Sequence, residues 1–126
     1  MLNLSELNIV EPKTTEDNNS ARVGGITLVY HKNSKRIIFS KRIINFLGNP
    51  EKVTFKFAGN YLILKGEEFE GFSLKSMSKQ KVIYNANLIK EILDNFNIKF
   101  EDAFIKTFSN IEEIENVENT IAIKIN

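Results

Sequence analysis

The sequence predicts a mostly-β α+β fold. Two tandem ββαββ repeats are expected to form a pseudo-two-fold, swapped-hairpin β-barrel with two short helices. Three observations support this. Several short stretches alternate apolar and polar residues, as half-buried strands do. Two other stretches follow a Ser or an Asn and space their apolar residues three or four apart, as capped helices do. The same order of stretches occurs twice within 126 residues.

The repeat is clearest where residues 36–47 align with residues 81–92. Each block starts with a basic residue, followed by two aliphatic residues, an aromatic residue and a small polar residue. Four blocks in the same order favour an internal duplication, although two unrelated βαββ stretches sharing a bias toward Ile, Lys and Asn would also show some likeness. The other matching blocks are Gly25–Leu28 with Gly71–Leu74, Val53–Phe57 with Phe104–Phe108, and Asn60–Lys65 with Asn119–Lys124.

The first repeat, residues 25–66, is expected to contain four strands and one helix. Ser40 is a suitable N-cap, because its hydroxyl can accept a hydrogen bond from a free N–H of the first helical turn. Gly48 can adopt the left-handed conformation that ends a helix, and Pro50 prevents the helix from continuing. The predicted strands are 26–32, 36–39, 51–57 and 61–65, and the predicted helix is 41–47.

The second repeat, residues 71–126, repeats this order with a longer helix. Asn85 is the expected N-cap of a helix over 86–96, and strands are predicted over 104–108 and 120–125. Residues 109–118 form an acidic insertion, for which we expect a solvated loop with a short helical turn. Residues 22–126 then form one domain, and residues 1–21 form a flexible polar arm.

Composition excludes several classes of function. The chain has no Cys and one His, which excludes disulfides, thiol nucleophiles and Cys-based zinc sites. We therefore expect no metal site, no cofactor and no catalytic residues. No apolar run reaches the length of a membrane span, and the first ten residues lack the pattern of a secretory signal. A cytoplasmic protein that does not enter membranes is predicted.

The net charge of +1 conceals an uneven distribution. Residues 22–65 carry nine basic residues and one acidic residue. Basic side chains at a helix start oppose the helix dipole, whereas a phosphate there would bind both these cations and the free N–H groups. The residues predicted to bind nucleic acid are Lys32, Lys35, Arg36, Lys41, Arg42 and Arg22, with His31 as a flanking contact.

Residues 35–65 resemble the AbrB-like (SpoVT/AbrB, MazE-type) swapped-hairpin domain. The residues that carry the resemblance are 35–41, 43–48, 49–53 and 59–64. Ser40 stands where that family usually has Pro, Pro50-Glu51 replaces a Gly-Asp pair, and the second copy lacks the Gly after its helix. The resemblance implies dimers with exchanged hairpins, and DNA contacts from Lys35, Arg36, Lys41 and Arg42. Two units in one chain imply a monomer with internal pseudo-symmetry. A homodimer and an unrelated α+β fold stay open.

Two functions are compatible with these features. The first is a non-catalytic transcription regulator of AbrB-like type that binds DNA phosphates in a salt-sensitive manner. The alternative is a small phage or mobile-element protein, antitoxin-like or anti-CRISPR-like, that inhibits a protein partner; the acidic insertion and the polar arm motivate it. A third interpretation is that the cations only keep the surface hydrated and guard strand edges.

Overall fold

The computed structural model describes residues 24–114 and 116–126. The predicted arm over residues 1–21, and Arg22, lie outside the described residues. The helices are α2 (Lys41–Phe46) and α3 (Ala86–Asn95). The strands are β1 (Ile26–His31), β2 (Ser34–Phe39), β3 (Lys52–Ala58), β4 (Tyr61–Glu67), β5 (Phe72–Ser73), β6 (Lys75–Met77), β7 (Gln80–Ile83), β8 (Phe104–Phe108), β9 (Ile111–Glu113) and β10 (Thr120–Lys124).

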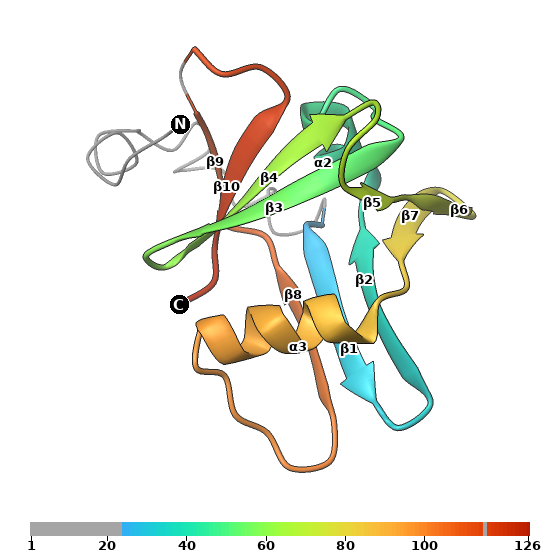
Figure 1. Cartoon of the computed structure of the whole chain (residues 1–126), viewed down its shortest axis with the longest axis vertical. Coiled ribbons are helices and arrows are strands. Elements are labelled where there is room, and N and C mark those ends of the chain that lie inside the picture. Colours follow the sequence, from blue (N-terminus) through green and yellow to red (C-terminus); the bar gives the residue numbers. More distant parts are fainter. Residues whose placement is uncertain (1–23, 115) are drawn as a thin grey trace.

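The strands form two antiparallel five-stranded sheets (Figure 1). Sheet A has the order β6-β7-β2-β1-β8, and sheet B has the order β5-β3-β4-β10-β9. The prediction of a mostly-β α+β fold with two helices is therefore confirmed. The expected closed barrel does not form within the described residues, because the ladders stop where the chain passes from one sheet to the other. The chain does so at three places: through α2 between β2 and β3, at Leu74 between β5 and β6, and at residues 109–110 between β8 and β9.

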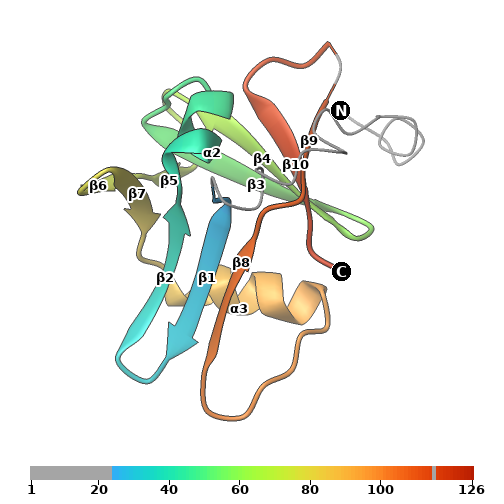
Figure 2. The ribbon, with the colours of Figure 1, turned by 180° about the vertical axis from the view of Figure 1, so that it is seen from behind.

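The core lies between the two sheets and under α3. Alternate residues of β1 and β2 point into it, including Leu28 and Phe39, which are both fully buried. Helix α3 adds Leu88, Ile89, Ile92 and Leu93 from its apolar side. Figures 1 and 2, which view the molecule from opposite sides, show α3 lying against one face of sheet A only. The opposite face of sheet A is not covered by α3, although Val29 and Val82 on that face are buried.

Both predicted N-caps are confirmed. The Ser40 hydroxyl accepts a hydrogen bond from the Ile43 N–H at 3.4 Å, and the Asn85 side-chain oxygen accepts one from the Leu88 N–H at 2.9 Å. Gly48 follows α2 with φ +81°, as expected for a helix-ending glycine. After α3, where the second repeat has no glycine, Asn97 adopts φ 55°. Asn tolerates this left-handed conformation better than most residues, so it replaces the missing glycine.

The acidic insertion differs from its prediction. It contains strand β9, which pairs with β10, instead of a helical turn. Glu112 was expected in a solvated loop, yet it is only 6% exposed. It accepts a hydrogen bond from the Tyr61 hydroxyl at 2.6 Å, beside a second small apolar cluster that includes Ile63 and Ile114. The reason is that residues 111–114 supply apolar side chains that sheet B can bury, and the Tyr61 hydroxyl gives Glu112 a partner.

Candidate nucleic-acid interface

The predicted cations do not form one compact cluster. Lys32 lies in the β1–β2 turn, and Lys41 begins α2. Figure 1 places this turn and α2 at opposite ends of β2. The rise of a strand puts Lys35 about 20 Å from Lys41 along the chain path. Neighbouring strand residues also point to opposite faces, so Lys35 and Arg36 extend from different sides of sheet A.

Lys35 lies on the side of sheet A that faces α3 and packs over Tyr30. Its Nζ is 5.3 Å from the centre of the Tyr30 ring and donates to the Lys32 carbonyl oxygen at 3.3 Å. The Tyr30 ring in turn packs edge-on against Phe100, with centroids 5.4 Å apart. This arrangement fixes the aliphatic part of Lys35 and leaves its ammonium group beside the hairpin turn.

Arg36 extends from the other face of sheet A. Its Nη1 donates to the Ser34 hydroxyl, whereas its Nε is buried and has no hydrogen-bond partner among the described residues. A buried donor without a partner costs about 1–3 kcal/mol. The Arg36 guanidinium therefore has donor capacity that the described part of the protein does not use.

The remaining predicted residues have mixed roles. Arg42 donates through Nη1 to the Gly24 carbonyl oxygen at 3.4 Å, and its guanidinium lies 5.5 Å from the centre of the Phe46 ring. Lys41 is exposed. His31 accepts a hydrogen bond through Nδ1 from the Asn33 N–H at 3.3 Å, which supports the turn. Arg42 thus joins α2 to the start of β1 as well as carrying charge.

Sequence reasoning missed three lysines that the fold brings beside β2. Lys75 and Lys81 lie in strands β6 and β7, and Lys79 lies in the turn between them. Lys81 pairs with Phe39, so the β6–β7 hairpin adjoins the end of β2 that leads into α2. The net charge of residues 66–96 gave no sign of these lysines, because Glu67, Glu68 and Glu70 offset their charge in the sum. The sequence alignment of residues 36–47 with residues 81–92 contained a signal for them, since it places Lys81 opposite Arg36.

Sheet A as a whole contains basic residues but no acidic ones. Its five strands contain no Asp or Glu. The cations of its strands are Lys35, Arg36, Lys75, Lys81 and Lys106. Further cations follow in the connecting segments, at Lys32, Lys79, Lys41 and Arg42. The basic region is therefore a property of sheet A, to which both halves of the chain contribute.

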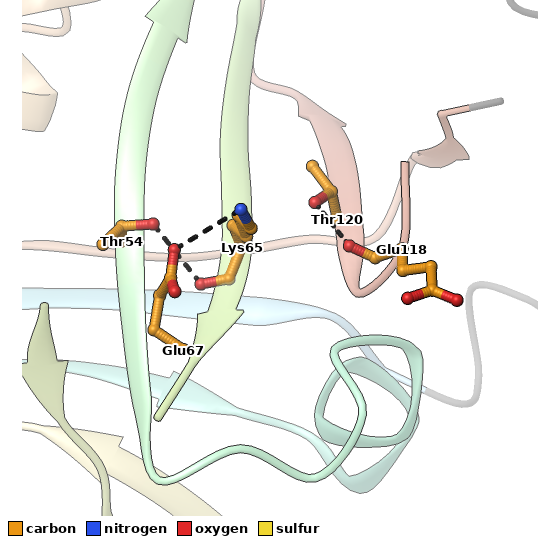
Figure 3. Close-up of polar contacts among 5 residues, drawn as sticks. All are labelled: Thr54, Lys65, Glu67, Glu118 and Thr120. Atoms are coloured by element: carbon orange, nitrogen blue, oxygen red, sulfur yellow. Dashed lines mark hydrogen bonds and ion pairs between the residues drawn. The ribbon is translucent and has the colours of Figure 1, made fainter. Parts of the chain in front are cut away.

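Sheet B mixes both signs of charge. Figure 3 shows Lys65 beside Glu67, with 3.7 Å between Lys65 Nζ and the Glu67 carboxylate. The same view shows Thr120, whose hydroxyl donates to the Glu118 carbonyl oxygen at 2.9 Å. The hydrogen bond from Tyr61 to the buried carboxylate of Glu112 raises the pKa of Tyr61 to about 12, with burial as the second cause. In sheet B the carboxylates of Glu67 and Glu112 therefore take part in interactions within the protein.

Other chemistries find no support in the described residues. They contain no group of three or more His, Cys, Asp or Glu residues that could hold a metal ion. None of the helices described is long and apolar enough to cross a membrane. Comparisons with protein-family models, with curated proteins and with solved structures found no match.

Proposed function

We propose that this protein is a non-catalytic nucleic-acid-binding regulator that holds phosphates through sheet A. The observation that carries the proposal is the charge of that sheet, with five cations and no acidic residue in its strands. Like charges gathered on one sheet weaken folding slightly, so stability alone does not favour this distribution. A polyanion removes that repulsion and releases its own counterions on binding.

Two groups of cations provide the phosphate-binding side chains. The first lies at the β1–β2 hairpin, with Lys32, Lys35 and Arg36. The second lies at the opposite end of β2, where Lys41 and Arg42 are joined by the β6–β7 lysines. Cations at both ends of β2 match an extended polyanion better than a single small anion, because one phosphate cannot span about 20 Å.

We also infer that the chain is an internally duplicated ββαββ unit with a pseudo-two-fold axis. Strand β2 pairs with its counterpart β7, and β4 pairs with its counterpart β10, both antiparallel, as a two-fold axis requires. The strand pairing changes the alignment of one sequence block, in which Val53–Phe57 was matched with Phe104–Phe108. Phe72 pairs with Val53, and Ile26, the counterpart of Phe72, pairs with Phe108. The counterpart of Val53 is therefore Phe108 and not Phe104.

The test measures binding by fluorescence anisotropy, using a labelled DNA duplex and its single strand over a range of salt concentrations. We expect binding at low salt that weakens steeply as salt rises. For the duplex, the steepness of the log–log plot should fall by about 0.9 for each phosphate that a variant no longer neutralises. Replacing Lys35, Arg36, Lys41 and Arg42 with Ala should reduce both affinity and steepness. Replacing Lys75, Lys79 and Lys81 with Gln should have a similar effect.

A matched control replaces sheet B cations. Lys52, Lys56 and Lys124 changed to Gln remove the same charge as the β6–β7 variant, but from the other sheet. We expect this control to keep most of the affinity. The proposal is wrong if neither nucleic acid binds at low salt, and the site lies elsewhere if the sheet B variant loses as much affinity as the sheet A variants.

A further inference from the structure

We propose that the nucleic acid binds as a single strand across the outer face of sheet A, with a base stacked on Tyr84 and phosphates held by Arg36 and Lys75. The outer face is the side of sheet A turned away from α3 and the core. This inference rests on the proposed function, because it assumes that sheet A holds phosphates.

Strand register aligns Arg36, Val29 and Ile105 in one row across three strands of the outer face, with Val29 in the middle only 3% exposed. Arg36 pairs with Val29, and Val29 pairs with Ile105. Ile37 pairs with Ile83, so continuing the β2–β7 register by one residue places Tyr84 beside Arg36. The row therefore reads Tyr84, Arg36, Val29, Ile105. With strands about 4.8 Å apart, it spans about 14 Å.

Lys75 belongs to the next row. It pairs with Val82, and Val82 pairs with Ile38, so all three side chains share the outer face with Arg36. Lys75 is exposed. A strand that crosses Tyr84 thus meets one cation in the same row and another in the neighbouring row, on a sheet whose strands carry no carboxylate to repel it.

Tyr84 is exposed where its counterpart in the first repeat is buried. Tyr84 is 57% exposed, whereas Phe39 is fully buried. Ile105, at the far end of the same row, is 64% exposed. Tyr84 and Ile105 are therefore exposed at the two ends of the row, with Arg36 and the buried Val29 between them. An exposed ring with a neighbouring arginine is the arrangement on which single-stranded bases stack.

Neither helix is placed to read a duplex groove. Helix α3 points its apolar side into the core, and the exposed residues on its other side include Glu91 and Asp94, which repel phosphate. Helix α2 has only six residues, and Ile43 and Ile44 are buried. The outer face of sheet A, with the exposed ring of Tyr84 beside its cations, suits unpaired bases, whose flat rings are accessible.

Two other ligands could cover the outer face of sheet A, a second copy of this chain or an acidic protein, and the charge of the face argues against the first. A second copy packed face to face would bring Arg36 and Lys75 against the same cations of its partner, with no acidic residue from either sheet A to neutralise them. An acidic protein has suitable charge but gives no particular role to an exposed ring beside an arginine. The single strand accounts for the ring, the cations and the missing carboxylates together.

The experiment measures binding of fluorescein-labelled dT12 and of a 12-base-pair duplex to the full chain at low salt, by anisotropy. We expect dT12 to bind more tightly than the duplex. Tyr84→Ala should weaken dT12 binding about tenfold or more, because stacking on an aromatic ring contributes that much. Tyr84→Phe keeps the ring and should stay within about twofold of the wild type.

Phe69→Ala is the matched control. Phe69 is 81% exposed and lies in the β4–β5 loop, outside sheet A. Its truncation should leave dT12 binding unchanged. Tyr84 and Phe69 are both exposed, so all three variants should melt at nearly the wild-type temperature, which separates a loss of binding from a loss of folding.

The outcomes separate this inference from the proposed function. If Tyr84→Ala binds like the wild type while the sheet A lysine variants do not, the inference is wrong and the proposed function stands. Tighter binding of the duplex, or an equal loss in Tyr84→Phe and Tyr84→Ala, also overturns stacking. If neither DNA binds but a Glu-rich peptide binds and requires Arg36, the face serves an acidic protein and both proposals fail.

Discussion

Sheets A and B have five strands each but treat charge differently. The strands of sheet B contain four lysines and three glutamates, and two of those glutamates interact with other side chains of the sheet, Lys65 and Tyr61. The strands of sheet A contain five cations and no acid. Sheet B therefore contains charges of both signs, two of its carboxylates having partners within the sheet, whereas the five cations of sheet A have no carboxylate in their own sheet to neutralise them. Under the proposed function sheet A binds the ligand and sheet B is structural, and the following predictions test that distinction.

The largest change in the free energy of unfolding is expected for a substitution in the core that both sheets share. Phe39 is fully buried in sheet A, and its ring lies 6.4 Å from that of Phe55 in sheet B. We expect Phe39→Ala to lower the free energy of unfolding by about 3–5 kcal/mol in urea denaturation. Ile105→Ala, which truncates an exposed side chain of the same sheet, should change it by less than about 0.5 kcal/mol. Two separate unfolding transitions in the wild type would show that the sheets do not share one cooperative core.

A smaller effect should come from the Tyr61–Glu112 pair in sheet B. Tyr61→Phe removes the hydroxyl that donates to the buried Glu112 carboxylate. We expect the free energy of unfolding to fall by about 1–3 kcal/mol, because the carboxylate then stays buried without this donor. Tyr84→Phe removes the same atom from an exposed ring in the other half of the molecule, and it should cost less than about 0.5 kcal/mol. Equal costs would mean that Glu112 finds another donor.

The same pair predicts a dependence on pH. The pKa of Tyr61 is raised from 10.0 to about 12, so the folded state holds this proton more tightly than the unfolded state. The stabilisation is fully present below about pH 10, the unfolded pKa, and disappears as pH rises from about 10 to about 12. Comparing urea denaturation of wild type and Tyr61→Phe should show the two curves converging in this window. A constant difference throughout the window would contradict the assignment.

The smallest effects should come from exposed charges. Glu67→Gln removes the ion pair with Lys65, whose side chain is 51% exposed, and should change stability by less than about 1 kcal/mol. Replacing Lys75 and Lys81 with Gln should leave stability unchanged or slightly higher, since it reduces like-charge repulsion on sheet A. A clear loss of stability in the second variant would mean that the cations of sheet A have a structural role after all.

The sequence predicted the positions of most helices and strands, but it did not predict which strands pair. Strands β1, β3 and β8 and both helices lie where alternation and capping place them, because these signals depend on neighbours along the chain. Strand β9 was missed because three residues inside an acidic stretch give little alternation, and only pairing with β10 stabilises them.

For the candidate interface too, the sequence located residues but did not show which of them lie together in space. The sequence located Lys32, Lys35, Arg36, Lys41 and Arg42, but treated them as one cluster because they are close in number. Strand alternation separates Lys35 from Arg36, and the length of β2 separates the hairpin from α2. The lysines of β6–β7 were averaged with nearby glutamates, although pairing with β2 carries them into sheet A.

The sequence by itself determined the kinds of elements, their caps and the uneven charge. These follow from local propensity and from periodicity, which each segment carries wherever it is placed. Only the tertiary structure decided that the strands of sheet A have no acidic residue, that Tyr84, directly after β7, is exposed, and that Glu112 is buried. These depend on which strands pair and in what register, and pairing joins residues that are far apart in the chain.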